Sequence, residues 1–185
     1  MTASATTAPS DPHALWRAAS AFAARMHRNQ LRRDGKTPYF SHLARVAQNI
    51  SAVFGCTDPT ILAAAYLHDT IEDTTTDYED IADNFGSIVA DCVAALTKNM
   101  ALREPEREDE YHNRLRTGPW QARLVKLADV LDNMADLVDY PLAERAEHSK
   151  KTFDRARHAV ALLSPDDLNR PEFKAAVAAV HAALG

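Results

Sequence analysis

The sequence predicts an all-α fold, and three observations support that prediction. Only five of the 185 residues are glycine, and runs of β-branched residues are sparse. Alanine, leucine, arginine and glutamate are abundant, and these residue types favour helices over strands. Apolar residues recur every three or four positions in several segments, as they do on the buried face of a helix. At this length we expect one folded domain, residues 11–185, after a disordered tail, residues 1–10.

The N-terminal half of the chain is predicted to form two amphipathic helices and one buried helix. A helix-start signal at residues 10–12 opens a helix over residues 11–28. After a loop rich in arginine, Ser41 is a suitable N-cap for a second helix that ends near Gly55. Residues 58–73, DPTILAAAYLHDTIED, then begin with a stretch that is apolar around its whole circumference. Such a helix belongs in the middle of a domain.

The C-terminal half contains one segment that differs from the rest. Thr76 and Glu79 form a capping box for a short helix that ends at Phe85, and another helix follows. Residues 98–119 are highly charged and lack a clear apolar stripe, so we expect a mobile connection or lid. The remaining helices are expected over residues 120–140, 142–163 and 166–184.

Composition and charge argue against several classes of function. A net charge of −5 is unsuited to a dedicated nucleic-acid binder, because such proteins neutralise phosphates with clustered lysine and arginine. No segment offers the run of about 20 apolar residues that a membrane span needs, and the N-terminus lacks the features of a signal peptide. We therefore expect a cytoplasmic protein without nucleic-acid or membrane partners. Cys56 and Cys92 are expected to stay reduced.

The C-terminal end of the buried helix concentrates polar side chains. If residues 58–73 form one continuous helix, His68, Asp69, Glu72 and Asp73 share one side of it. That end of a helix already carries about half a negative charge from the backbone dipoles. A bound cation would offset the crowding of carboxylates. The alternative is that these acidic residues simply meet water.

Two other candidates are ambiguous when taken alone. His42 falls in the first turn of its helix, where a histidine is usually a cap or a surface residue. Asp129 shares a helix face with Asp132, Asn133 and Asp136, opposite the leucines. Periodicity by itself therefore favours a solvated polar stripe for Asp129.

The order of these residues along the chain resembles the signature of the HD-domain superfamily of metal phosphohydrolases. That signature is an isolated histidine, an HD pair and a distant aspartate, here His42, His68 with Asp69, and Asp129. Within the superfamily the chain is most similar to the hydrolase domain of RelA/SpoT-type enzymes and to the small alarmone hydrolases. The similar segments are FAARMHRNQLRRDGKTPYFSH, AAAYLHDTIEDT, FG with LTK after it, and VKLADVLDNM.

The resemblance implies an all-helical HD-type domain that holds a manganese ion on these four side chains. It also implies removal of pyrophosphate from the ribose 3′ position of guanosine tetraphosphate or pentaphosphate, a small-molecule substrate, to leave GDP or GTP. Two imidazoles and two carboxylates suit Mn²⁺, Fe²⁺, Zn²⁺ or Mg²⁺, so the residues themselves leave the metal open. The oligomeric state also stays open.

Further roles follow from the same resemblance. Glu72 and Asp73 match the catalytic carboxylates of the family, which position and deprotonate water or protonate the leaving oxygen. The positions that match substrate contacts are Arg25, Lys98 and Asn133. As alternatives, Arg25 is a surface arginine and Asn133 belongs to the solvated stripe.

Three positions depart from the family pattern and bear on the substrate. Met26 replaces a frequent basic residue, Leu43 a frequent proline, and Thr152 a tyrosine that helps to hold the nucleotide. Two alternatives therefore remain beside the alarmone hydrolase. One is an HD phosphohydrolase that acts on another nucleotide, such as a nucleoside monophosphate or NADPH, and the other is a non-catalytic, antitoxin-like binding module.

Overall fold

Helix α3 (Pro59–Leu67) is the central element of the fold in this computed structural model, which describes residue 11 and residues 13–185. It packs against α1 (Ala14–Met26), α2 (Phe40–Gln48), α6 (Ser87–Leu96) and α8 (Trp120–Ala135). Asp58 caps it by accepting hydrogen bonds from the first backbone amides, and most of its apolar side chains are fully buried. The prediction of a buried helix in the middle of the domain is confirmed. The predicted tail, residues 1–10, lies outside the described residues.

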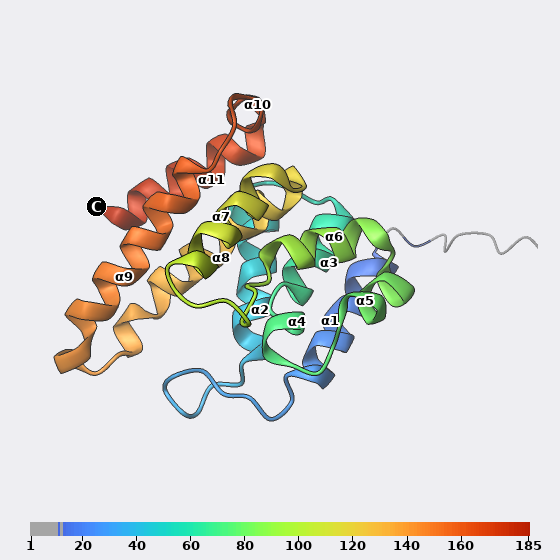
Figure 1. The fold of residues 1–185 in the computed structure, drawn as a ribbon, viewed down its shortest axis with the longest axis horizontal. Helices are drawn as coiled ribbons and strands as arrows, with labels where there is room; N and C mark the ends of the chain where they lie inside the picture. Colours follow the sequence, from blue (N-terminus) through green and yellow to red (C-terminus); the bar gives the residue numbers. More distant parts are fainter. Residues whose placement is uncertain (1–10, 12) are drawn as a thin grey trace, which may run out of the picture.

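The remaining elements surround this centre (Figure 1). Helix α2 continues into a π-helical turn, Asn49–Val53, and the chain reverses at Gly55, whose φ of 73° suits glycine. The other elements are α4 (Thr70–Asp73), α5 (Tyr78–Phe85), α7 (Glu106–Thr117), a 3₁₀ turn (Asp136–Asp139), α9 (Leu142–Ala161), α10 (Pro165–Asn169) and α11 (Pro171–Leu184). Among the described residues the only β pairing is an isolated bridge between Leu31 and Pro38. The predicted all-α class is confirmed.

Helices α9 and α11 pack against α8 and lie on the far side of the molecule from α1 and α5 (Figure 1). Helix α8 therefore has neighbours on both sides, since α2, α3 and α6 contact it from the core. No helix in the described part of the chain is both long enough and apolar enough to span a membrane.

The predicted mobile lid over residues 98–119 is wrong for most of its length. Residues 106–117 form helix α7, which Tyr111 and Leu115 anchor because they lie one turn apart and are both buried. Arg114 adds hydrogen bonds to the carbonyls of Ala94 and Thr97 at 3.0 and 2.7 Å. Two apolar side chains per three turns are too few to make a visible stripe, yet they bury one edge of the helix.

Several predicted helix ends shift because different residues make the caps. Ser41 is the second residue of α2 and not its N-cap. The capping box of α5 is Asp77 with Asp80, one residue after the predicted pair, while the Thr76 side chain is buried. The last predicted helix, residues 166–184, is two helices, because the chain is extended at Arg170 before the proline that opens α11.

Candidate active site

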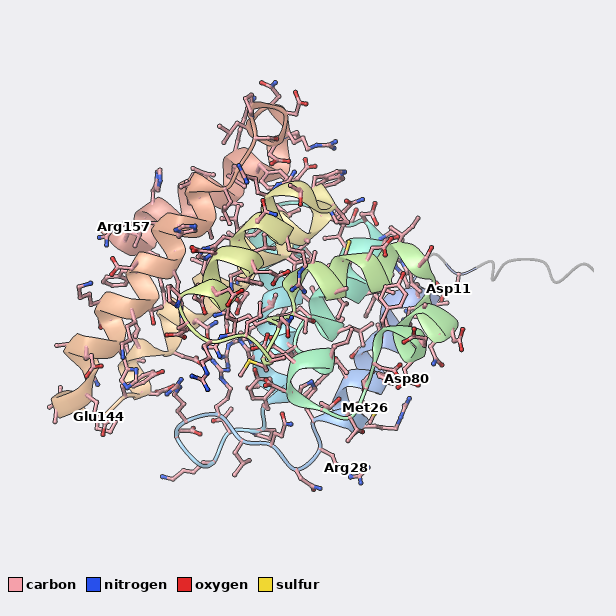
Figure 2. The ribbon with its side chains drawn as sticks, viewed as in Figure 1. Asp11, Met26, Arg28, Asp80, Glu144 and Arg157 are labelled. Carbon is pink, nitrogen blue, oxygen red and sulfur yellow. The ribbon has the colours of Figure 1, made fainter. Side chains whose placement is uncertain are left out.

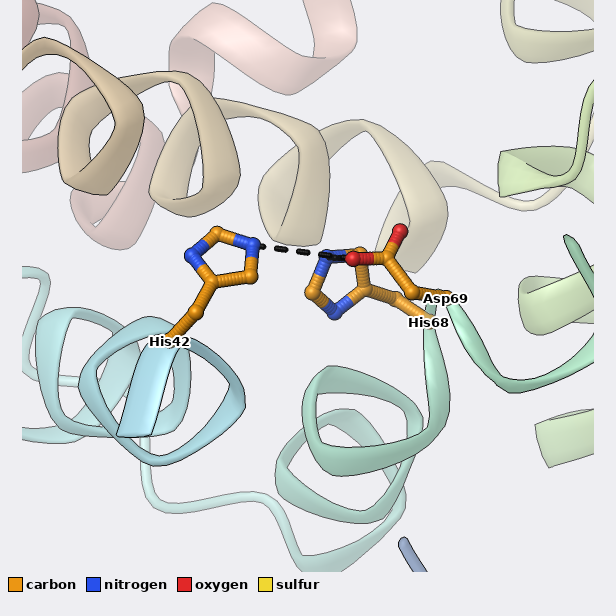
Figure 3. Close-up of side chains that lie close together, drawn as sticks. All are labelled: His42, His68 and Asp69. Carbon is orange, nitrogen blue, oxygen red and sulfur yellow. Dashed lines mark ion pairs between the residues drawn. The ribbon is translucent and has the colours of Figure 1, made fainter. Parts of the chain in front are cut away.

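The HD pair lies at a break in the chain, and the prediction of one continuous helix over residues 58–73 is wrong. Helix α3 ends before His68, and after a turn at His68 and Asp69 the short helix α4 begins. The His68 ring donates a hydrogen bond from Nδ1 to the carbonyl of Ala65 at 2.8 Å. A side-chain contact of this kind competes with continuation of the helix. The turn directs both members of the pair toward His42 of α2 (Figure 3).

The four predicted metal ligands converge, although they come from three separated segments. The ligand atoms of His42, His68 and Asp69 all lie within 4.8 Å of one another. The Asp69 Oδ2 atom is 3.1 Å from His68 Nε2 and 3.6 Å from His42 Nε2. Asp129 Oδ1 approaches the same two nitrogens, at 3.4 Å from His42 and 3.8 Å from His68. Both carboxylates thus lie close to the two imidazole nitrogens, and Asp129 lies at the edge of the group of three mutually close ligand atoms.

Asp129 does not lie on a solvated stripe, so the prediction from periodicity alone is wrong. Its residue is only 8% exposed, and Asp132 on the same face is 3% exposed. The Asp129 carboxylate accepts hydrogen bonds from Asn133 at 2.5 Å and from Lys126 at 2.8 Å. Helical periodicity separates a polar from an apolar face, but both faces of α8 have protein neighbours here.

Each histidine is oriented by a contact at Nδ1, the ring nitrogen that does not face Asp69 and Asp129. His42 Nδ1 is 2.6 Å from Asp132 Oδ2, and His68 Nδ1 donates to the Ala65 carbonyl. When Nδ1 of a neutral imidazole carries the proton, Nε2 keeps a lone pair, and here both Nε2 atoms face the carboxylates. His68 Nε2 is buried without a hydrogen-bond partner, since Asp69 is close to it but not in hydrogen-bonding direction. This orphaned nitrogen and the donor set fit a divalent metal ion.

Charges at the site are strongly coupled to one another. Burial by itself would lower the pKa of His68, but the neighbouring carboxylates of Asp69 and Asp129 raise it to about 9. Burial raises the pKa of Glu72 and of Asp73, and the negative charge of Asp69 raises both further. The pKa values of these two carboxyl groups therefore lie above those of ordinary surface acids, although Asp73 itself is exposed.

Glu72 and Asp73 belong to α4, which follows the HD pair in the chain. Glu72 Oε2 accepts a hydrogen bond from the backbone amide of Lys98 at 2.8 Å, which holds it against the end of α6. The Lys98 side chain pairs with Glu108 of α7 at 2.6 Å. Gln30 donates a hydrogen bond to the backbone carbonyl of Asp73 at 2.7 Å, and this contact ties the end of α4 to the loop after α1.

The site opens into one cleft with a volume of about 460 Å³. Its lining includes Glu72 and Asp73, and also the predicted substrate contacts Lys98 and Asn133, together with Thr152 of α9. Arg25 is not brought to the cleft: it is exposed on α1 and lies over the ring of Phe22. Met26, labelled in Figure 2, is the last residue of α1 and is also absent from the lining.

Several side chains around the ligands were missed by the sequence analysis. Tyr39 donates a hydrogen bond to Asp69 Oδ2 at 2.6 Å, and Arg45 holds Asp132 through Nε and Nη2 at 2.6 and 2.9 Å. Spacing offered a weak signal, because Arg45 follows His42 by three residues and Asp132 follows Asp129 by three. Nothing in the sequence indicated that Tyr39 would reach the HD pair.

The family model of the HD domain matches residues 19–158, which contain all four converging residues and both carboxylates of α4. The chain belongs to the HD-domain family. The predicted resemblance and the HD-type helical fold are thereby confirmed. An HD domain implies a divalent metal, which agrees with the donor set around His42 and His68.

Known HD-domain relatives extend this result. A guanosine-3′,5′-bis(diphosphate) 3′-pyrophosphohydrolase of Danio rerio is 43% identical over 117 residues, which cover 63% of this chain and 65% of the relative. The chain thus spans slightly less than two thirds of that relative. The enzyme of the same name from Drosophila melanogaster is 35% identical over 150 residues, 80% of this chain and 84% of the relative. A solved metazoan ortholog of SpoT, described as hydrolysing ppGpp, has a TM-score of 0.77 at 32% identity and covers 96% of this chain and 98% of its own.

Proposed function

We propose that this HD-domain chain is a metal-dependent 3′-pyrophosphohydrolase of guanosine tetraphosphate and pentaphosphate, which releases pyrophosphate and leaves GDP or GTP. The observation that carries the proposal is the convergence of His42, His68, Asp69 and Asp129. The last three of these line one cleft together with Glu72 and Asp73, and His42 is buried against them. The printed activity of the Danio rerio and Drosophila melanogaster relatives supports the choice of substrate.

The metal in this proposal is Mn²⁺, and the four converging side chains would hold it. A divalent ion there supplies a Lewis acid for a phosphoryl oxygen and lowers the pKa of water. The chain would supply the Nε2 atoms of His42 and His68, which lose their proton when a metal binds. Their orientation is set by Asp132 and by the Ala65 carbonyl. The chain also supplies two carboxylates that Tyr39 and Lys126 hold by hydrogen bonds.

Glu72 and Asp73 handle the protons of the reaction in this proposal. One carboxylate accepts a proton from the attacking water, and the other returns a proton to the ribose oxygen that leaves. Their raised pKa values suit both tasks, because an acid or base is most effective when its pKa approaches the working pH. The amide of Lys98 positions Glu72 for either role.

Basic and polar side chains on the cleft wall would bind the phosphates and the sugar. We place Lys98 and Asn133 among these contacts because both line the cleft. Arg33 and Arg155 also line it and are exposed, so they are available to an anionic ligand. Arg25 is not part of the proposed site, because it lies outside the lining.

The decisive experiment is product identification. The chain is loaded with Mn²⁺ and incubated with guanosine tetraphosphate, and the products are separated by ion-exchange chromatography and observed by ³¹P NMR. We expect GDP and pyrophosphate in equal amounts, and neither from His68→Ala.

Other products would contradict the proposal in distinguishable ways. Release of orthophosphate from NADPH or from a nucleoside monophosphate, with guanosine tetraphosphate left intact, indicates another HD phosphohydrolase. Binding of the nucleotide without turnover in the presence of Mn²⁺ indicates a non-catalytic module.

A further inference from the structure

An ion pair between the buried Asp132 and the partly exposed Arg45 lies directly behind His42. Asp132 of α8 is 3% exposed, and its Oδ2 atom is 2.6 Å from His42 Nδ1. Arg45 of α2 donates to both oxygens of the same carboxylate, from Nε at 2.6 Å and from Nη2 at 2.9 Å. Figure 3 shows that one ring nitrogen of His42 faces Asp69 while the other points away from it. The pair therefore contacts the nitrogen that the proposed metal does not use.

The two histidines of the site are held by different means. His68 donates Nδ1–H to the carbonyl of Ala65, a backbone group of the helix that precedes it. No substitution of a side chain removes that acceptor. His42 depends on the carboxylate of Asp132, which belongs to another helix. Because a carboxylate accepts and does not donate, it selects the tautomer that leaves Nε2 with a lone pair facing Asp69 and Asp129.

Asp132 is itself held in place from the solvent side. Arg45 Nη2 also donates to Asp136 at 2.8 Å, and Arg32 of the preceding loop donates to the other Asp136 oxygen at 2.7 and 2.9 Å. The chain of contacts runs from the loop through two guanidinium groups to His42. Asp132 is absent from the lining of the 460 Å³ cleft, so it is not a substrate contact.

We propose that Asp132, fixed by Arg45, is the positioning residue that sets the tautomer and orientation of His42 for metal binding. This inference rests on the metal site of the proposed function. Outer partners of metal-binding histidines commonly contribute 10- to 100-fold to metal affinity. Asp132 acts through His42 alone, and it gives no group to the reacting atoms.

The test measures the affinity of the full chain for Mn²⁺ alone, by titration with EPR detection of the free ion. Asp132→Ala removes the acceptor. Asp132→Asn keeps the size, but its amide presents a donor either to His42 or to Arg45, both of which are donors to the parent carboxylate. We expect each variant to bind Mn²⁺ about 10- to 100-fold more weakly. The nearly isosteric Asp132→Asn keeps the test valid if Asp132→Ala does not fold.

Asp167→Asn is the matched control. Asp167 is 1% exposed and is held by two nitrogens of Arg123, so it reproduces the burial of Asp132 and its contact with an arginine without contact to a histidine. Arg123 is more buried than Arg45, at 9% against 35% side-chain exposure. We expect Asp132→Asn and Asp167→Asn both to lose stability, whereas only Asp132→Asn should lose Mn²⁺ affinity.

Three results separate the possible failures. Parental affinity in both Asp132 variants, or an equal loss in Asp167→Asn, overturns the positioning role. A parent chain that binds no Mn²⁺ overturns the metal site and both proposals with it. A parent that binds Mn²⁺ but leaves guanosine tetraphosphate intact overturns only the proposed function.

Discussion

Helix α8 contributes to an arginine–aspartate pair at each end, and the two pairs differ in what else they contact. Near its N-terminus, Arg123 meets Asp167 at 2.7 and 3.1 Å, and near its C-terminus Asp132 meets Arg45 at 2.6 and 2.9 Å. Both aspartates are almost inaccessible to solvent. The arginines differ in exposure, since the Arg45 side chain is 35% exposed and the Arg123 side chain is 9% exposed. The distances and the burial of the aspartates alone give no reason to assign the pairs different roles.

Their remaining hydrogen bonds make the difference. Arg123 also donates to the backbone carbonyls of Leu115, Arg116 and Gly118, and Asp167 completes a capping box with Ser164. Apart from that local cap of α10, the contacts of the pair join α8 to α10 and to the end of α7. Asp132 instead accepts a further hydrogen bond from His42, whose other nitrogen lies 3.6 Å from Asp69 and 3.4 Å from Asp129. Buried ion pairs are weak evidence for stability by themselves, so the other partners of each pair indicate its role.

The largest effect is expected in activity, from the two carboxylates of α4 that line the same cleft as Asp129 of α8. Glu72→Gln and Asp73→Asn remove the proposed proton carriers beside the metal ligands, so turnover of guanosine tetraphosphate should fall about 100- to 10,000-fold. The melting temperature and Mn²⁺ affinity should stay near the parental values, because neither residue is a proposed ligand. Glu79→Gln, at an exposed acid on α5, is the control and should leave turnover unchanged. Near-parental turnover in both variants would return these residues to the status of solvated acids.

Substitutions in the Arg123–Asp167 pair, near the N-terminus of α8, should lower the free energy of unfolding. Arg123→Met leaves Asp167 buried without its partner, and breaking a buried pair in this way costs about 3–5 kcal/mol. Urea denaturation measures the loss in the free energy of unfolding. The double variant Arg123→Met with Asp167→Leu removes both charges and should recover much of the loss. A loss below about 1 kcal/mol in the single variant would show that the pair is not a significant structural link.

Metal removal should lower the stability of the folded chain through the proposed ligand Asp129, in the C-terminal half of α8. An ion that binds only the folded chain adds about 2.7 kcal/mol to its stability at a free concentration of 100 times Kd. Thermal unfolding with Mn²⁺ and with EDTA measures this difference. We expect it in the parent and in Arg123→Lys, and we expect it to vanish in Asp129→Ala, which lacks one proposed ligand. A persistent Mn²⁺ effect in Asp129→Ala would remove that residue from the site.

The smallest expected effect is a change with pH in the contribution of the Arg123–Asp167 pair to stability. Burial would raise the pKa of Asp167, but hydrogen bonds from Arg123 and Ser164 outweigh it and lower the pKa below its usual value. Between the lowered folded value and the unfolded value of about 3.9, the unfolded chain binds more protons, so stability falls as the pH falls. The stability difference between parent and Asp167→Asn, measured without metal, should shrink when the pH is lowered through this window. A difference that is constant or grows toward acid would contradict the lowered pKa.

Local pattern predicted the helices well where apolar residues dominate. The burial of α3 follows from its alanines, Ile61 and Leu67, which leave no polar face for solvent. Prediction failed at α7, because the two residues that anchor it, Tyr111 and Leu115, are outnumbered by charged neighbours. It also failed at His68, where a ring-to-backbone hydrogen bond accompanies the end of the helix. In both cases a specific contact outweighed the average character of the segment.

The sequence by itself determined the class of fold, and the order of its motif identified the four side chains that converge. It did not determine which face of α8 would be buried. A helix wheel separates the leucines from Asp129 and Asp132, but it contains no information about the helices that pack on the second face. Only the tertiary structure brings α2, α3 and α8 together around His42 and His68. That same packing makes Asp132 a hydrogen-bond acceptor for His42, because the two lie 90 residues apart in sequence and meet only when the helices pack.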